Sequence, residues 1–405
     1  MALRVLVAPS GFKESLEAEQ VAECIEEGVL RVVPDAEISK APMVDGGEGF
    51  TKTLVNATGG TLHEVTVTGP VGEPVESYFG ILGGAEGTPR VAVLEMAAAA
   101  GLRLVPRDLR DPSGTTTYGV GELIRAALDA GADCILVGCG DSGTTDGGAG
   151  MAQALGVRLL DRAGNELDRG GAELARLDSV DLSGRDPRLD SVPIEVACNW
   201  HNVLCGPRGV ARVFGPQKGA TPEAVEKLDA ALENYAAVIR EQVGVDARQM
   251  PGGGASGGLG TGLQALVGAT LHPRYEIVSR YLEIESLLEK ADLVFTAEGG
   301  IDFQTPRGKI PVEIARRAKR YGLPVVAIVG TVGKDAQINH DHGIDAYVSI
   351  LQAPVTLDQA IEQACDLVTV CAEDVMRLVM LGRELAPASP SGFGEELRPE
   401  GAPAV

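Results

Sequence analysis

Four glycine-rich segments of the chain also carry carboxylates or hydroxyls, and these are the residues whose types and spacing point most directly to chemistry. They are residues 45–49, 141–148, 252–258 and 298–302. Glycine lets backbone N–H groups approach phosphate oxygens, and the N-terminus of a following helix adds a favourable dipole. Carboxylates beside such loops bind Mg²⁺ or accept the proton of an attacking hydroxyl. Together the segments predict phosphate chemistry.

Several of these residues also have a purely structural interpretation. Asp45 can form an Asx-turn that caps the helix predicted after it. Glu298 and Asp302 can cap a helix N-terminus. Asp146 can orient a glycine turn, and Lys13 can be a solvated lysine. Both interpretations stay open at this point, because residue type and spacing fit each of them.

Two G-x-G-x-x-G patterns support a different class of protein. One is formed by Gly138, Gly140 and Gly143, and the other lies within residues 252–257. The pattern alone is weak in a chain with 53 glycines, and no Walker A sequence is present. The first match follows a predicted strand, and Asp161 lies beyond it at the end of another. An NAD(P)-dependent oxidoreductase is therefore an alternative function.

Length and charge limit the possible partners. A chain of 405 residues exceeds the size at which one hydrophobic core stops growing, so two domains are expected. The net charge of −22 disfavours nucleic acid and anionic lipid as partners. We expect the seven cysteines to be reduced thiols in a cytoplasmic protein, without a signal peptide or membrane span. A small-molecule substrate fits these limits, and a homodimer remains open.

Strand-like apolar runs alternate with helical patterns along the chain, which predicts an α/β protein with parallel sheets. Residues 4–8 and 37–43 read as strands near the N-terminus, and residues 293–296, 325–329 and 346–350 read as strands near the C-terminus. Between them, residues 61–94 resemble short strands separated by Gly-Pro turns, and residues 132–137, 157–160 and 193–197 read as strands of another sheet.

Similar strand-like runs, alternating with helical patterns, occur near both ends of the chain. This similarity predicts a domain that is split in sequence. We expect residues 1–62 and 272–386 to form a flavodoxin-like, doubly wound parallel sheet domain, with a second α/β domain, residues 63–271, inserted. In such a sheet the loops after the first and third strands lie side by side. Residues 387–405, rich in Pro, Ser, Gly and Glu, are predicted to be a disordered tail.

Several motifs resemble the bacterial type I glycerate kinases. They occur at residues 7–15, 44–49, 94–97, 118–123, 145–151, 214–220 and 298–311. The resemblance runs in order from residue 3 to about residue 380. It implies ATP and Mg²⁺ as cofactors, a small hydroxy acid such as glycerate as substrate, and an active site between the two domains.

The site residues that follow from the resemblance and from the loop chemistry fall into four groups. Catalytic roles are expected for Asp45 as the base, and for Lys13 and Lys309 as charge-stabilising groups. The others are assigned to substrate (Ser10, Glu48, Asn199, Gly300 and Lys218), to nucleotide (Gly252, Gly253, Gly254, Ser256, Gly257 and Asp146) and to metal (Glu298 and Asp302).

Five positions depart from the pattern that the family resemblance implies. They are Ser10, Val120, Asp141, Asn199 and Gly300, and all lie in predicted loops or at their edges. Loss of an arginine at position 300 would remove a bidentate clamp for carboxylate or phosphate. A repurposed homologue with another acceptor or reaction is therefore a further alternative.

Overall fold

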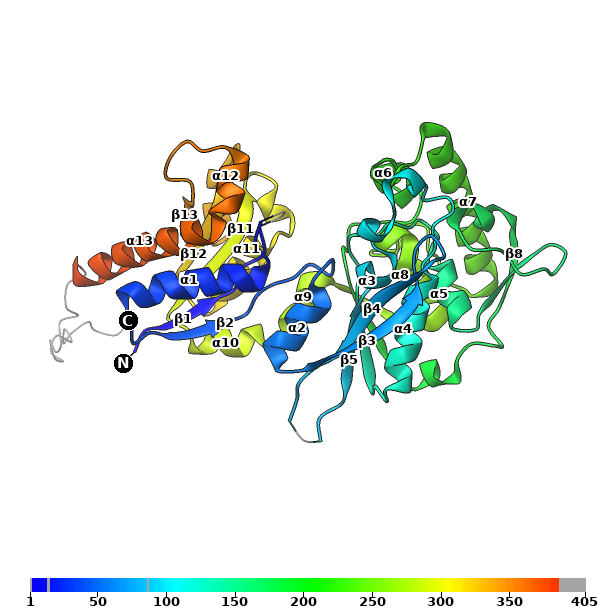
Figure 1. The fold of residues 1–405 in the computed structure, drawn as a ribbon, viewed down its shortest axis with the longest axis horizontal. Helices are drawn as coiled ribbons and strands as arrows, with labels where there is room; N and C mark the ends of the chain where they lie inside the picture. Colours follow the sequence, from blue (N-terminus) through cyan, green and yellow to red (C-terminus); the bar gives the residue numbers. More distant parts are fainter. Residues whose placement is uncertain (1, 13–14, 86, 386–405) are drawn as a thin grey trace, which may run out of the picture.

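The computed structural model describes residues 2–12, 15–85 and 87–385, which form an α/β protein with two large sheets (Figure 1). The first sheet has five parallel strands in the order β13-β12-β11-β1-β2. Its strands are β1 (Arg4–Val7), β2 (Glu37–Lys40), β11 (Leu293–Ile301), β12 (Val325–Val332) and β13 (Ala346–Ser349). Strands from the two ends of the chain therefore share one sheet.

Helices cover both faces of the five-stranded sheet, because alternate residues of each strand point to opposite faces. Val5 and Val7 of β1 pack with α1 (Ala18–Val32) and α13 (Ala364–Leu385). Leu6 faces the other side, where α10 (Ile284–Lys290) and α11 (Ile310–Arg320) complete the core. The short helix α12 (Leu357–Glu362) precedes α13.

The second sheet has six strands in the order β10-β9-β6-β5-β4-β3 and is mixed. Its antiparallel part pairs β3 with β4 and β4 with β5, whereas β5, β6, β9 and β10 are parallel. The strands are β3 (Thr61–Thr68), β4 (Pro74–Ile81), β5 (Val91–Glu95), β6 (Cys134–Gly138), β9 (Ile194–Cys198) and β10 (Thr270–Pro273).

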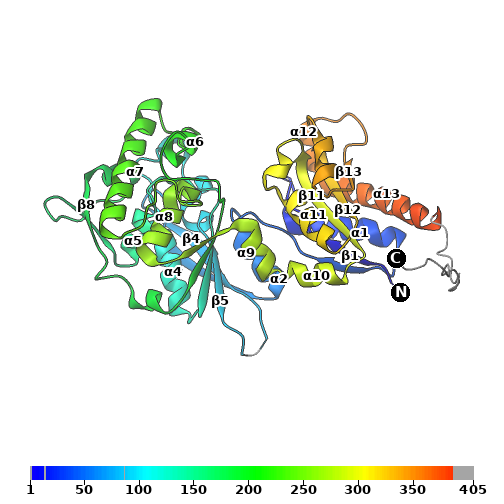
Figure 2. The same ribbon diagram turned by 180° about the vertical axis from the view of Figure 1, so that it is seen from behind.

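One face of this sheet is covered by α2 (Phe50–Thr58) and α9 (Arg274–Tyr281), and α9 lies between the two sheets (Figures 1 and 2). The other face packs on the remaining helices and on a small two-stranded sheet of β7 and β8. These elements are α3 (Ala97–Ala100), α4 (Tyr118–Asp129), α5 (Ala149–Ala154), β7 (Arg158–Asp161), β8 (Leu177–Asp181), α6 (Val210–Phe214), α7 (Pro222–Gln242) and α8 (Ala255–Val267).

The strand predictions from both ends of the chain are confirmed. Val5, Ile38, Val294, Val326 and Val348 all lie in the five-stranded parallel sheet. Two details were wrong. The strand that was predicted to end at residue 296 continues to Ile301, since Gly300 pairs with Thr331. The strand near residue 157 joins β8 instead of the large second sheet.

The prediction that every cysteine is a reduced thiol is wrong for two of them. Cys24 in α1 and Cys365 in α13 form a disulfide, with their Cα atoms 5.8 Å apart. The pairing depends on the packing of α1 against α13, which a sequence separation of 341 residues conceals. The predicted tail at residues 387–405 lies outside the described residues. No described helix is long and apolar enough to cross a membrane.

Gly28 marks the close approach of α1 and α13. A Cβ atom added there would lie 2.4 Å from the carbonyl oxygen of Thr369, so Gly28→Ala must push the helices apart. We expect this variant to lower the free energy of unfolding by about 1–3 kcal/mol.

Gly382→Ala on α13 is the matched control, because a Cβ there meets no atom within 4 Å. Better helix propensity should leave it as stable as wild type or more stable by up to about 1 kcal/mol. Urea unfolding measures both variants. Equal stability of Gly28→Ala and wild type would show that the helix contact adjusts without cost.

Candidate active site

The loop after β1 lies beside the C-terminal part of β11, a segment that the sequence had placed in the loop after this strand. The backbone N–H of Ser10 donates to the carbonyl of Ala297 at 2.8 Å, and the Ser10 hydroxyl donates to the same oxygen at 2.9 Å. Met43, which leads into the 45–49 loop, donates to the carbonyl of Pro9 at 2.8 Å. The buried Ser10 side chain thus ties the loop after β1 to β11, and the backbone of Pro9 ties it to the segment that leads into the 45–49 loop. Lys13 lies outside the described residues.

Lys309 and Glu298 meet at the end of β11. The Lys309 ammonium lies 3.3 Å from Glu298 Oε1 and donates to the carbonyl oxygen of Gly300 at 3.2 Å. Glu298 and Gly300 are strand residues on the same face of β11, instead of loop residues as the sequence suggested. The extended β11 strand therefore places a carboxylate and a cation together at the carboxyl ends of the strands of this sheet.

Asp302 stabilises a turn after β11, which differs from the helix cap that the sequence left open. Its Oδ1 accepts a 2.8 Å hydrogen bond from the N–H of Gln304, and its own N–H donates to the hydroxyl of Thr305. In the part of the chain that the structure describes, no three His, Cys, Asp or Glu side chains gather as a metal site. The carboxylates of Glu298 and Asp302 fit a Mg²⁺ ion that takes only one or two ligands from the protein. Phosphates and water would supply its remaining ligands.

Asp45 is an accessible carboxylate at the junction of the two sheets. Its Oδ1 accepts the N–H of Gly47 at 3.2 Å, and Arg274, the first residue of α9, lies 3.6 Å from Oδ2. Burial is the main cause that raises the pKa of Tyr275, and the charges of Asp45 and Glu298 both add to it. The charges of both carboxylates therefore act on the same phenol.

The 45–49 loop rests against the carboxyl edge of the six-stranded sheet. A Cβ added at Gly46 would lie 3.1 Å from both the nitrogen of Cys139 and the carbonyl oxygen of Ala197, which sit at the ends of β6 and β9. Only glycine tolerates this approach, and its φ of +89° is also left-handed. The loop thereby brings Asp45 and Glu48 to the edge where ligands of parallel sheets usually bind.

Glu95 at the end of β5 holds this loop, and the sequence gave it no role. Its buried carboxylate accepts the N–H groups of Gly49 at 3.1 Å and Thr51 at 2.8 Å, and the hydroxyl of Tyr78 at 3.1 Å. Burial raises the pKa of Glu95, while the three donors oppose the rise. The sequence feature that could have indicated this role is the motif at residues 94–97, which contains Glu95 and lies at the end of a predicted strand.

Asp141 holds the same loop from a second side. Its Oδ2 accepts the N–H of Glu48 at 3.0 Å, and its own backbone is left-handed with φ of +48°. Together with Asp45 and Glu95, it pairs the N–H groups of residues 47–49 and 51 with carboxylates. The start of α2 is therefore occupied by protein carboxylates and is a poor phosphate cradle.

Lys218 is buried against the loop that follows β6. Its ammonium donates to the hydroxyl of Ser142 at 2.8 Å and to the carbonyl of Thr144 at 2.6 Å. Asp146 in the same loop is fully buried and accepts hydrogen bonds from Thr117, Gly148 and Gly150. Burial raises the pKa of Asp146. Its side chain thus organises the glycine turn.

The N–H groups of Gly252, Gly253 and Gly254 are paired within the protein. They donate to the carbonyls of Trp200, Met250 and Asn202 at 3.1, 2.9 and 3.1 Å. A Cβ at Gly257 would lie 2.0 Å from the carbonyl oxygen of Thr144, so this glycine allows the start of α8 to touch the loop after β6. Close packing explains these glycines, and the Ser256 hydroxyl is buried nearby.

Two other predicted residues have local partners. Asn199 Oδ1 accepts the N–H of His201 at 3.1 Å, which forms a turn after β9. Glu48 lies 3.6 Å from Arg103 in an exposed ion pair. Asp161, which supported the dinucleotide alternative, lies in the small sheet and binds Asn165 and Arg176. Its position is therefore outside the sheet that contains the G-x-G-x-x-G segment.

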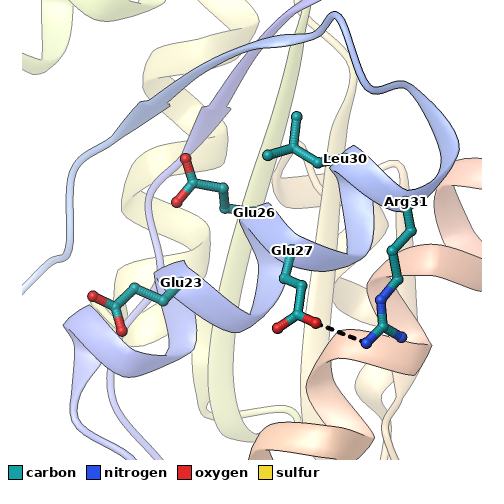
Figure 3. Close-up of a pocket in the computed structure, with 5 residues that line it drawn as sticks. All are labelled: Glu23, Glu26, Glu27, Leu30 and Arg31. Carbon is teal, nitrogen blue, oxygen red and sulfur yellow. Dashed lines mark hydrogen bonds and ion pairs between the residues drawn. The ribbon is translucent and has the colours of Figure 1, made fainter.

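A surface hollow on α1 is separate from these loops. It has a volume of about 440 Å³ and is lined by Glu23, Glu26, Glu27, Leu30 and Arg31 (Figure 3). Arg31 is paired with Glu27 at 2.7 Å. An acidic lining from a single helix repels phosphate and carboxylate substrates, so we place no substrate site there.

Carboxylates and cations from the carboxyl ends of strands in two sheets define a two-sheet α/β enzyme. The sequence matches the glycerate kinase family over residues 5–380, and the chain belongs to that family.

Relatives in several bacteria align over nearly the full length. The chain is 46% identical to a glycerate kinase of Bacillus subtilis (strain 168) over 95% of this chain and 99% of the relative. It is 44% identical to glycerate 2-kinase of Escherichia coli (strain K12) over 94% and 99%. A crystal structure of a putative glycerate kinase 2 from Salmonella typhimurium LT2 superposes with a TM-score of 0.83, at 46% identity and 95% and 100% coverage.

The hydrogen bonds of Glu95 make it a test of how the 45–49 loop is held. Glu95→Gln keeps the shape but replaces one acceptor oxygen with an amide that cannot accept the N–H of Gly49 or Thr51. A hydrogen bond to a charged group contributes about 1.5–3 kcal/mol, so we expect kcat/KM for glycerate to fall at least about tenfold. Steady-state kinetics and urea unfolding, measured together, separate turnover from stability.

Glu64→Gln is the control, since Glu64 is an exposed carboxylate on β3 of the same sheet. It should match wild type in both measurements. Wild-type kcat/KM in a folded Glu95→Gln protein would contradict the role assigned to Glu95.

Proposed function

We propose that this protein is an ATP-dependent glycerate kinase, which transfers the γ-phosphoryl group of ATP to a hydroxyl of glycerate or of a related small hydroxy acid. The observation that carries the proposal is membership of the glycerate kinase family over residues 5–380. The relatives in B. subtilis and E. coli, which are named glycerate kinase and glycerate 2-kinase, align with almost the whole chain. An oxidoreductase is not favoured, because Asp161 lies away from the segment that it would have to serve.

In the proposed mechanism Asp45 accepts the proton of the acceptor hydroxyl. Its carboxylate is accessible, and Arg274 and the N–H of Gly47 fix its two oxygens. The proton moves to a carboxylate oxygen of Asp45 as the acceptor oxygen bonds to the γ-phosphorus. The bond from this phosphorus to the bridging oxygen breaks, and ADP leaves with the electron pair. Glu95 and Asp141 hold the backbone that carries this group. Positioning and electrostatics supply most of the rate enhancement in such transfers.

The cations in the proposed mechanism stabilise negative charge. Lys309, held between Glu298 and the carbonyl of Gly300, faces the charge on the transferring group or the acceptor carboxylate. We propose the same role for Lys13. Mg²⁺, when bound with the nucleotide, neutralises phosphate charge, and Glu298 and Asp302 are the residues that would hold it.

We propose that substrate contacts come from Glu48 and Asn199, and that Ser256 and Gly257 lie on the nucleotide side. Because their N–H groups are already paired, Gly252, Gly253 and Gly254 would shape this region without binding phosphate directly. Ser10 and Asp146 would act through the loops that they hold.

We also propose a flavodoxin-like domain formed by residues 1–62 and 272–386, with residues 63–271 inserted. The strand order β2-β1-β11-β12-β13 and the helices on both faces support a doubly wound sheet. Because α2 and α9 pack on the six-stranded sheet, the boundaries between the two domains fit better in the 45–49 loop and at the end of α9. A homodimer and a cytoplasmic location stay predictions from the sequence.

Removal of the proposed base tests the mechanism. Asp45→Asn keeps an oxygen for the N–H of Gly47 but cannot accept a proton, so we expect kcat to fall by about 10²–10⁴-fold. The KM for ATP should change little, because Asp45 acts on the acceptor. ADP release in the presence of glycerate provides the measurement, with Glu64→Gln again as control. A kcat within a factor of about three of wild type would exclude Asp45 as the base.

The departures at Asn199 and Gly300 generate a prediction about the acceptor. Missing polar partners in a site cost about 1–3 kcal/mol each, so glycerate should bind weakly and an acceptor of different size or charge should be preferred. Asn199→Asp combined with Gly300→Arg should then raise kcat/KM for glycerate. Kinetics with glycerate and a panel of C3 to C5 hydroxy acids test this. A wild-type value of about 10⁴ M⁻¹s⁻¹ or more for glycerate would contradict it.

A further inference from the structure

Lys218 is a buried cation without a carboxylate partner in the part of the chain that the structure describes. Only 2% of the residue is exposed, and its two hydrogen bonds go to the uncharged oxygens of Ser142 and Thr144. Among the described residues, Asp146 is the carboxylate whose charge acts on this ammonium, and the two form no ion pair. An ammonium has three N–H donors, so one remains without a partner here. Burying an unpaired cation costs several kcal/mol, which indicates that its partner arrives as a ligand.

Unpaired hydroxyls lie in the same loop. The Oγ1 atoms of Thr144 and Thr145 are buried and have no hydrogen-bond partner, and both residues are fully buried. The loop follows β6, which lies between β5 and β9 in the parallel part of the six-stranded sheet. Ligands of such sheets bind beyond the carboxyl ends of the strands. An ammonium and hydroxyl donors at that edge form a receptor for an anionic group.

We propose that Lys218, with the hydroxyls of the loop after β6, binds a phosphoryl group of the nucleotide. This inference rests on the proposed kinase function and names the anion that Lys218 receives. A nucleotide phosphate fits better than the acceptor carboxylate, because Lys218 contacts Ser142 and Thr144 in the loop after β6. Asp45, the proposed base, instead contacts Gly47 and Arg274. A compact ammonium also suits a phosphate, because a phosphate can be bound by a point charge and does not require the planar guanidinium of an arginine.

The charged surroundings of Lys218 support this assignment. Burial lowers the pKa of Lys218 to about 7, and the charge of Asp146 opposes the decrease. Lys218 belongs to a short turn, Pro216–Lys218, that packs on α6, where Arg212 is paired with Asp229 and Glu226 of α7. The backbone of Arg110 lies against the following Gly219, and Cys139 in the loop after β6 is a neutral thiol whose pKa burial raises.

A bound anion favours the charged form of a lysine and therefore raises its pKa. At pH 8 the free protein holds Lys218 mostly neutral, so binding of a phosphoryl group should take up close to one proton. At pH 6 Lys218 is already protonated, and no uptake is expected. The affinity should correspondingly weaken by up to about tenfold for each pH unit above the pKa of the free state, until the pKa of the bound state is reached.

Isothermal titration calorimetry in buffers of different ionisation enthalpy measures this proton uptake. The full chain is titrated separately with ADP-Mg²⁺, inorganic phosphate and glycerate at pH 6 and pH 8. We expect uptake with ADP-Mg²⁺ at pH 8 in wild type. Lys218→Met should abolish the uptake, and Lys218→Arg should bind ADP-Mg²⁺ without it, because arginine stays charged. Lys227→Met, which removes an exposed lysine on α7, should behave like wild type.

Each other outcome overturns the inference. Binding of ADP-Mg²⁺ without uptake in wild type removes Lys218 from the phosphoryl site and leaves the kinase function intact. Uptake with glycerate but not with ADP-Mg²⁺ assigns the lysine to the acceptor carboxylate instead. Failure of ADP-Mg²⁺ to bind at all removes both the inference and the proposed function. The wild-type titration decides the question even if Lys218→Met does not fold.

Discussion

The buried carboxylate of Glu95 is the interaction on which the arrangement of the site depends. It joins the end of β5 to the start of α2, and in doing so fixes the 45–49 loop. A buried carboxylate is stable only when its oxygens are hydrogen-bonded, and two N–H groups and the hydroxyl of Tyr78 meet that need. The loop that enters from the five-stranded sheet is thereby attached to the edge of the six-stranded sheet, where Asp45 reaches Arg274.

Electrostatics divide this site into two sides. Around the 45–49 loop, carboxylates occupy the N–H groups at the start of α2, which leaves a negative region that contains Asp45, the proposed base. Around the loop after β6, a buried ammonium and unpaired hydroxyls form a positive region. In a chain with a net charge of −22, such local cations are what allow anionic substrates to bind.

Much of the fold could be predicted because buried parallel strands appear in the sequence as continuous apolar runs. The strands around Val5 and Val326 were found this way, since both faces of their sheet are buried. The extension of β11 to Ile301 was missed, because Glu298 and two glycines do not resemble a strand. Pairing with β12 overrides that local preference. The Cys24–Cys365 disulfide was missed for a related reason, since only the packing of two distant helices brings the thiols together.

The sequence by itself predicted which loops are candidates for the active site, because segments rich in glycine and carboxylates follow several predicted strands. It also determined the family, through motifs spread over residues 5–380. Only the tertiary structure decided what each residue does within those loops. Gly252 and Glu95 illustrate the difference: the N–H of Gly252 is already paired, and Glu95 holds a loop more than 40 positions away. Hydrogen bonds between distant segments have no signature in local sequence, because their geometry exists only after the sheets have formed.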